Sequence, residues 1–190
     1  MGVITWFNLQ KLKVLDKLKN TEKNLDIEWK KFLEKDTYLV NDLKIKLDQD
    51  ISKARKYHKI AWYLYLSKKI RDTLTRYPNI LNVYENTIKE YNKHFIGKRL
   101  EQHKNFFDGT QDNLEFGLDN DQRLAIIKDD RHNLVIAGAG SGKTAVLTSK
   151  VAYLTRRNDR IDPKKILVLA FNNKAVNEAK DRLAKDYKIN

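Results

Sequence analysis

The sequence contains no cysteine, two prolines and seven glycines in 190 residues. Without cysteine the chain can form no disulfide, thiol nucleophile or zinc–thiolate centre. The scarcity of proline and glycine favours long helices over a fold rich in turns. Long apolar runs are lacking too, because the longest, residues 60–66, is far too short to span a bilayer. With no basic stretch before a long apolar run at the N-terminus, we expect a cytoplasmic protein with no membrane partner.

Positive charge is what the chain has in excess. It carries 38 Lys and Arg against 25 Asp and Glu, a formal charge of +13. Such a charge suggests a polyanionic partner, most simply nucleic acid, although a merely soluble basic protein is the simpler alternative. Residues 1–116 carry 23 basic and 16 acidic side chains, and residues 117–190 carry 15 and 9. The excess is therefore shared, and is not a basic tail joined to a neutral domain.

Residues 1–116 have the pattern of long helices and form the first predicted domain. Apolar residues recur every three or four positions in a first stripe of Leu39, Leu43, Leu47, Ile51, Ala54, His58, Ala61 and Tyr65. A second stripe comprises Ile80, Val83, Tyr84, Ile88, Tyr91, Phe95 and Ile96. Pro78 disfavours helix at Tyr77 and separates the stripes. The pattern predicts an antiparallel, coiled-coil-like helical hairpin.

Three interpretations of this first domain remain open. It is a structural arm, a DNA-contacting arm, or a prong that docks on a protein partner. The aromatic stripe, which can pack helix on helix, favours the first interpretation. The second would use residues 53–59 and 68–71, which are basic clusters with aromatic residues between them. His58 has no second histidine nearby, so we interpret it as a helix-face residue and not as a metal ligand.

Residues 117–190 form the second predicted domain, in which the spacing of the apolar residues is different. Short apolar runs at 133–137 and 166–171 predict buried strands, and the patterns over 142–156 and 174–186 predict helices. Buried strands that alternate with helices indicate a parallel sheet with a right-handed crossover. The predicted class is therefore α+α/β. Residues 108–113 are the best candidate for the linker before it.

A phosphate-binding loop lies between the first predicted strand and helix. It fits the P-loop pattern apart from its first residue, and comprises Ala137, Gly138, Ala139, Gly140, Ser141, Gly142, Lys143 and Thr144. Glycines let successive N–H groups turn inward toward phosphate oxygens, and the helix N-terminus adds a favourable partial charge. Lys143 would reach the β- and γ-phosphates of ATP, and the Thr144 hydroxyl would bind Mg²⁺.

Gln122 has two interpretations that are compatible with each other. It stands three residues after Asp119, the spacing of a helix capping box. Its carboxamide could also pair with the N6 donor and N7 acceptor of adenine. We expect the cap to leave most of the amide free for the base.

Three segments together resemble the opening motifs of the UvrD/Rep-type superfamily 1 DNA helicases. Residues 118–122 resemble the Q-motif, and 137–144 resemble motif I, where the family commonly has alanine first. Residues 169–175, followed by Glu178 and Arg182, resemble motif Ia. The aromatic pair at 106–107, in a helical segment just before the Q-motif, resembles a pair found at the same place in the helicase IV branch of the family. The resemblance covers about residues 88–184.

This resemblance implies a RecA-like, Mg²⁺-dependent ATPase that moves 3′ to 5′ on single-stranded DNA and separates duplexes. It implies adenine recognition by Gln122 and strand contacts by Phe171, Asn172 and Asn173. An aromatic residue after a strand can stack on a base, although a buried strand end is an equal alternative for Phe171. Lys174 is either a phosphate contact or a solvated lysine.

Hydrolysis requires a further carboxylate that follows a third buried strand and holds Mg²⁺. No apolar run ending in Asp-Glu follows Phe171, and Asp129-Asp130 precedes the phosphate loop after a helical pattern. We therefore interpret the sequence as the N-terminal piece of a larger helicase, able to bind ATP but not to hydrolyse it alone. The alternative is a standalone module in which nucleotide binding controls attachment to DNA or protein.

Overall fold

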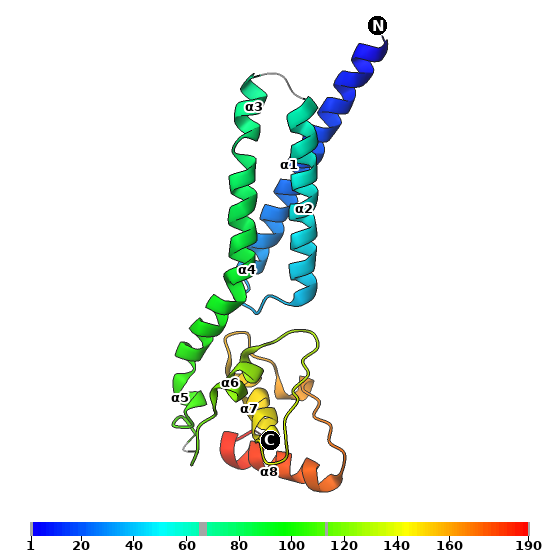
Figure 1. Cartoon of the computed structure of the whole chain (residues 1–190). Helices are drawn as coiled ribbons and strands as arrows, with labels where there is room; N and C mark the ends of the chain where they lie inside the picture. The colour runs from blue at the N-terminus through cyan, green and yellow to red at the C-terminus, as the bar shows by residue number, and fades with distance from the viewer. Residues whose placement is uncertain (1, 65–67, 113, 190) are drawn as a thin grey trace. The chain divides into compact units, whose positions relative to one another are not determined.

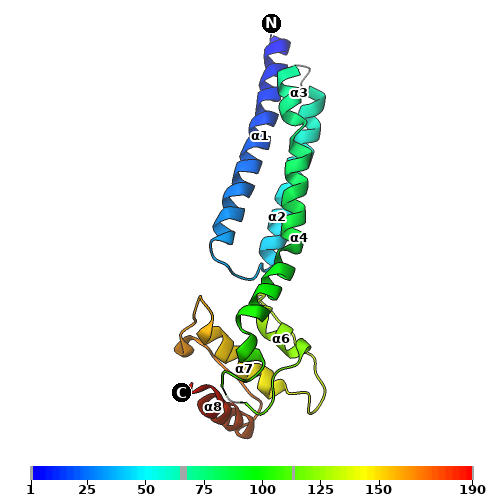
Figure 2. The same cartoon turned by 90° about the vertical axis from the view of Figure 1, so that its left-hand side faces the viewer.

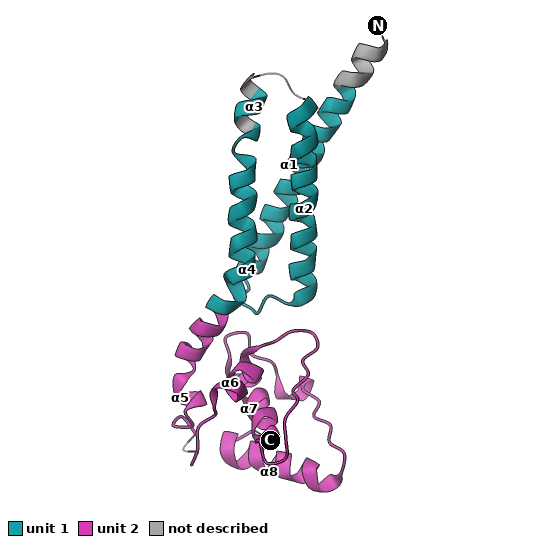
Figure 3. Cartoon of the chain, viewed as in Figure 1, with its two compact units in different colours: residues 1–94 teal, residues 95–190 magenta. Residues whose placement is uncertain are grey.

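The computed structural model describes residues 2–64, 68–112 and 114–189, with the side chains at 2–8, 68, 69 and 73 left aside. The chain forms two compact units, residues 1–94 and residues 95–190 (Figure 3). Helix α4 (Tyr77–Gln102) contributes residues to both. The domain division that the sequence pattern places after residue 116 stays a prediction. No helix in the described ranges is long and apolar enough to cross a membrane.

Unit 1 is a bundle of three long helices. Helices α1 (Gly2–Leu33), α2 (Asn41–Leu64) and the first part of α4 lie side by side, and the short helix α3 (Lys68–Leu74) connects α2 to α4 (Figures 1 and 2). All three contribute to one core, in which Leu25, Leu47 and Ile88 are at most 1% exposed. Members of both predicted stripes belong to this core together with residues of α1, so the predicted hairpin is part of a larger bundle.

The first predicted stripe faces this core. On α4, the residues that face the core are only partly those of the second predicted stripe. Ile51 and Ala54 are at most 3% exposed, and Tyr65 lies outside the described residues. On α4, Leu81 is 1% exposed, whereas Val83 is 65% exposed. The helix starts at Tyr77 with proline in its first turn, where the missing N–H is not needed. Pro78 thus lies in the first turn of α4 and does not interrupt a helix. The residues of α4 that face the core follow the helical period from Tyr77 onward.

Hydrogen bonds attach the segment that connects α1 and α2 to side chains of α4. The side chain of Asn92 accepts from the Leu39 N–H and donates to the Leu39 carbonyl, both at 2.9 Å. The Tyr91 hydroxyl donates to the carbonyl of Thr37 at 3.1 Å. Because these bonds satisfy the backbone of an otherwise irregular segment, they hold residues 37–39 in one conformation.

Unit 2 consists of short helices and irregular segments. After the end of α4 come α5 (Lys104–Phe107), α6 (Asn120–Ile127), α7 (Lys143–Arg156), the 3₁₀ turn η1 (Pro163–Lys165) and α8 (Asn173–Tyr187). Its buried apolar side chains come from Phe95 of α4 and from α5, α6, α7 and α8. Two predicted helices, 142–156 and 174–186, correspond closely to α7 and α8.

The predicted parallel sheet is wrong. The described residues contain no strand, and segments 133–137 and 166–171 are irregular. Leu134 and Ile136 are 86% and 88% exposed, and Leu167 is 80% exposed. An apolar run becomes a buried strand only when neighbouring strands pair with its backbone and other elements cover both of its faces. Neither condition is met here, so the start of a RecA-like sheet is not formed.

The Arg156 guanidinium connects three parts of unit 2. It donates two hydrogen bonds to the Asp112 carboxylate, at 2.7 and 2.9 Å, and a third to the Tyr187 carbonyl at 3.0 Å. It also lies over the rings of Phe106 and Tyr187, 5.6 and 5.4 Å from their centroids. The Tyr187 hydroxyl is 2.7 Å from the Ser149 hydroxyl. Asp112, which belongs to the candidate linker, is thus bound to α7 within this unit.

We predict that Arg156→Lys destabilises unit 2 by about 1–3 kcal/mol, because lysine cannot form the paired bonds to Asp112 or stack as a planar group. Hydrogen exchange of the α7 and α8 amides measures the loss of protection. Arg160→Lys, at an exposed position, is the control. Equal protection in the two variants would contradict a structural role for Arg156.

Candidate nucleotide-binding site

The predicted phosphate loop ends at a helix N-terminus, as the sequence indicates. Gly142 is the N-cap of α7, and its φ of 81° lies in the left-handed region, as does the 76° of Gly140. Such angles favour glycine because a Cβ would collide with the backbone. The first N–H groups of the 14-residue helix therefore follow directly on the loop. Their partial positive charge favours an anion at this point.

Lys143 lies across its own loop. Its ammonium group donates to the carbonyls of Ala137 at 3.1 Å and Gly138 at 2.6 Å. The Ser141 hydroxyl donates to the same Gly138 carbonyl at 2.8 Å. Thr144 is half-buried in the first turn of α7. The cation and the first turn of the helix are thus brought together at one loop, which is the arrangement that phosphate binding requires.

Gln122 forms the capping box and contacts the phosphate loop as well. Its N–H donates to the Asp119 carboxylate at 2.9 Å, and its side-chain oxygen accepts from the Asp119 N–H at 3.0 Å. Its side-chain nitrogen donates to the Ser141 carbonyl at 3.2 Å. Both the oxygen and the nitrogen of the side-chain amide are therefore hydrogen-bonded, which is more than the cap alone would require. A carboxamide has two N–H donors and two acceptor lone pairs, so one of each remains for a ligand.

Gly142 and Gln122 approach each other so closely that a side chain at position 142 would displace the Gln122 amide, in addition to the strain of the positive φ. A Cβ at position 142 would lie 2.7 Å from the Gln122 side-chain nitrogen, below any normal contact distance. By contrast, a Cβ at Gly138 meets nothing within 4 Å, and its φ is not positive. The predicted adenine-recognition residue and the predicted phosphate loop are therefore in direct contact.

Two cavities border this contact. The smaller, of about 280 Å³, is lined by residues that include Gln122, Ile136, Ala137 and Lys143. The larger, of about 860 Å³, is lined by 114–119, by loop residues 140–142 and by α8 residues that include Arg182 and Lys185. Gln122 and Ser141 border both. Each cavity is lined by basic and acidic side chains together, so the phosphate-attracting charge is confined to Lys143 in the smaller and to Arg182 and Lys185 in the larger.

Arg123 anchors the segment that precedes α6, and sequence reasoning missed it. Its guanidinium donates to the Leu118 carbonyl at 2.6 Å and to the Asp108 carboxylate at 2.8 Å. The hydrogen bond from Lys104, together with Arg123, lowers the pKa of Asp108 despite the opposing effect of burial. A Cβ at Gly117 would lie 2.9 Å from the Asp108 carbonyl, so this turn also requires glycine. Nothing local in the sequence indicates this pairing.

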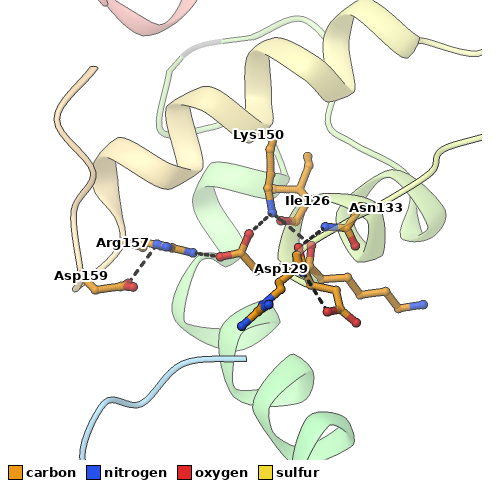
Figure 4. Close-up of polar contacts among 9 residues, drawn as sticks. Ile126, Asp129, Asn133, Lys150, Arg157 and Asp159 are labelled. Atoms are coloured by element: carbon orange, nitrogen blue, oxygen red, sulfur yellow. Dashed lines mark hydrogen bonds and ion pairs between the residues drawn. The ribbon is translucent and has the colours of Figure 1, made fainter. Parts of the chain in front are cut away.

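Asp129 lies in a cluster of ion pairs (Figure 4). Lys150 approaches its carboxylate at 3.1 Å and also donates to the Ile126 carbonyl at 2.7 Å. Arg157 binds the same carboxylate at 2.5 Å and Asp159 at 2.9 Å. Burial opposes the charge of Asp129, but the bond from Arg157 and the charge of Lys150 outweigh it, so its pKa lies below the usual value.

This cluster has a structural role. It connects the end of α6 to α7, and burial lowers the pKa of Lys150 even though Asp129 favours its charged form. Because Asp129 is committed to two cations, it is poorly suited to bind Mg²⁺. Within the described ranges, no three His, Asp or Glu side chains gather as metal ligands.

The residues expected to contact DNA lie at the start of α8. The Phe171 side chain is fully exposed, so the alternative of a buried strand end is wrong. The side-chain oxygen of Asn172 caps α8 by accepting from the Ala175 N–H at 2.9 Å. Asn173 and Lys174 are exposed in the first turn. The cap was missed, although asparagine just before a helical pattern is its usual signal.

Residues 118–190 match the family model of the UvrD/REP helicase N-terminal domain. The chain is 47% identical over 72 residues to a probable DNA helicase II homolog of Mycoplasma capricolum, covering 38% of the chain and 10% of that relative. It is 52% identical over 67 residues to the ATP-dependent DNA helicase SRS2 of Saccharomyces cerevisiae, covering 35% and 6%. For the ATP-dependent DNA helicase UvrD1 of Mycobacterium leprae the identity is 40% over 78 residues, covering 41% and 10%.

These matches confirm the predicted resemblance to the UvrD/REP helicases for residues 118–190. The chain spans about a tenth of the length of the curated relatives it matches. No solved structure matches it significantly. The nearer likeness to the helicase IV branch stays a prediction.

We predict that Gly142→Ala destabilises unit 2 by about 1–3 kcal/mol, because alanine is strained at positive φ and displaces Gln122. Gly138→Ala, in the same loop but in open space, is the matched control and should be nearly neutral. Urea denaturation gives both free energies. In a Gln122→Ala background the Gly142→Ala penalty should shrink, and an unchanged penalty would contradict the contact.

Proposed function

We propose that this chain is the ATP-binding part of an ATP-dependent DNA helicase that moves 3′ to 5′ on single-stranded DNA. The observation that carries the proposal is the meeting of Gln122, Lys143 and the α7 N-terminus at one loop. The match of residues 118–190 to the family supports it. The direction of movement depends on the family resemblance alone.

Nucleotide binding would use groups that now bind one another. The Lys143 ammonium exchanges the carbonyls of Ala137 and Gly138 for the β- and γ-phosphates of ATP. The N–H groups at the start of α7 support the same phosphates. The remaining donor and acceptor of Gln122 pair with the adenine edge. Adenine and phosphate recognition are then coupled through the bond from Gln122 to Ser141.

Thr144 would hold Mg²⁺. A hydroxyl in the first helical turn after the loop fits this role, because Mg²⁺ prefers oxygen ligands and retains water and phosphate oxygens as the others. The ion would neutralise the charge of the phosphates. In the sequence, no apolar run ending in Asp-Glu follows Phe171. We therefore expect the 190-residue chain to bind ATP without hydrolysing it.

DNA binding by this segment would centre on Phe171. Its exposed ring can stack on an unpaired base, a contact that any base can make. The side-chain oxygen of Asn172 caps α8, so a hydrogen bond to the strand falls to its NH₂ group. Asn173, in the first turn of α8, would contact sugar or phosphate.

We predict that Lys143→Ala weakens binding of a fluorescent ATP analogue about 10- to 100-fold, the usual effect of losing charge-assisted bonds. Lys174→Ala removes an equal charge from α8 and should bind as the unmodified chain does. Unchanged binding in Lys143→Ala would refute the site. DNA-stimulated phosphate release by the pure chain, lost in Lys143→Ala, would refute the expected lack of hydrolysis.

We predict that Phe171→Ala weakens oligothymidylate binding at least about fivefold, because base stacking on one aromatic ring contributes roughly 1–3 kcal/mol. Phe171→Tyr keeps the ring and should retain affinity. Leu169→Ala, at an equally open apolar position, is the control. Fluorescence anisotropy measures each affinity, and equal losses in Phe171→Ala and Leu169→Ala would exclude stacking.

A further inference from the structure

Unit 1 has a strongly uneven distribution of charge along its length. Helices α1 and α2 are antiparallel, and the Lys17 ammonium lies 5.9 Å from the Tyr57 ring centroid, which sets residues 9–20 beside residues 53–64. Figures 1 and 2 place these stretches and α3 at the same end of the unit. We call residues 9–20, 53–64 and 70–76 the basic end.

The sequence counts make this contrast clear. The basic end carries ten Lys and Arg against two Asp and Glu, whereas residues 21–52 and 77–94 carry eight against ten. Arg55 is paired with Glu85 at 2.6 Å. Lys56, Lys59 and Arg71 are exposed. The basic end therefore presents a concentrated positive charge to solvent, which attracts a polyanion.

An aromatic cavity opens within the basic end. It has a volume of about 330 Å³ and is lined by His58, Lys59, Trp62, Tyr63, Thr75 and Pro78. Tyr63 is 74% exposed and Trp62 is 38% exposed, so both rings are accessible to a ligand. The Arg71 guanidinium lies 5.7 Å from the Trp62 ring centroid.

The inner wall of this cavity is fixed. A ring nitrogen of His58 is 2.8 Å from the Leu74 carbonyl, and its ring is stacked at 6.1 Å from the buried Tyr77 ring. These contacts hold α2 against the start of α4. A rigid wall with exposed aromatic rings beside it binds a planar group at little cost in conformational entropy.

We propose that the basic end of unit 1 binds single-stranded nucleic acid, with a base stacked against Tyr63 and Trp62 and with phosphates paired to Lys59 and Arg71. Unpaired bases expose faces that aromatic side chains can stack on, whereas the bases of a duplex are already stacked. Cations beside the rings match the phosphate that accompanies every base. This site lies outside residues 118–190, so it does not depend on the proposed nucleotide-binding function.

An acidic protein segment would use the same cations. It gains much less from exposed rings, however, because carboxylates do not stack on them. The combination of rings and cations therefore favours nucleic acid. Removing the Tyr63 ring alone distinguishes the two ligands, because it should weaken the binding of nucleic acid and not that of an acidic protein segment.

The test uses the 190-residue chain in the Phe171→Ala background, so that the strand contact proposed in unit 2 is not measured. The probe is a fluorescein-labelled oligothymidylate of about twenty nucleotides, followed by anisotropy. We expect Tyr63→Ala to weaken binding at least about fivefold and Tyr63→Phe to retain it. Heparin, a polyanion without bases, should bind the Tyr63→Ala variant as tightly as the parent chain.

The cations are tested separately. Lys59→Glu with Arg71→Glu should weaken the binding of both oligothymidylate and heparin. If each of these two cations meets one phosphate, the slope of log affinity against log salt falls by about 1.4, since each contact contributes roughly 0.7 on single strands. Lys35→Glu with Lys93→Glu changes the charge equally outside the basic end and should have a smaller effect.

Oligothymidylate binding by Tyr63→Ala equal to that of the parent chain would overturn the proposal. So would, in the same Tyr63→Ala variant, equal losses of heparin and oligothymidylate binding, or a loss of polyglutamate binding with oligothymidylate binding intact. Circular dichroism at increasing temperature verifies that each variant is folded. ATP binding, which depends on Lys143, is measured on the same samples, so failure here leaves the proposed nucleotide function standing.

Discussion

The charged contact between Arg156 and Asp112 is the constraint on which unit 2 depends. Arg156 is the last residue of α7, and its guanidinium reaches the turn before α6, the end of α8 and two aromatic rings. A unit of short helices without a sheet has few long-range backbone bonds to hold it together. The planar guanidinium of Arg156 connects several of these segments to one another. It thereby positions α7, whose N-terminus follows the phosphate loop.

The same principle recurs in the site, where each functional side chain also has a structural task. Gln122 closes a capping box while it contacts the loop, Lys143 binds loop carbonyls, and Asn172 caps α8. These bonds keep polar groups satisfied and positioned when no ligand is bound. A ligand must then exchange bonds with them, which makes binding selective for groups that replace what is lost.

The sequence predicted the parts of the fold that depend on local signals. The cap at Asp119, the helix start at Lys143 and the helix over 174–186 follow from caps, glycines and periodicity, and they lie where expected. The strands at 133–137 and 166–171 were wrong because apolar character does not reveal whether pairing partners exist. The pairing of Arg156 with Asp112 spans 44 residues and leaves no local pattern.

The exposed apolar runs at 133–137 and 166–171 have a consequence for the behaviour of the chain in solution. Open β-prone segments favour association between molecules, and neighbouring charges oppose it. Lys164 and Lys165 precede the second run and Lys174 follows it, while Arg131 precedes the first. These cations act as gatekeepers through like-charge repulsion between copies. We therefore expect added salt to promote association, because salt screens that repulsion and leaves the apolar attraction in place.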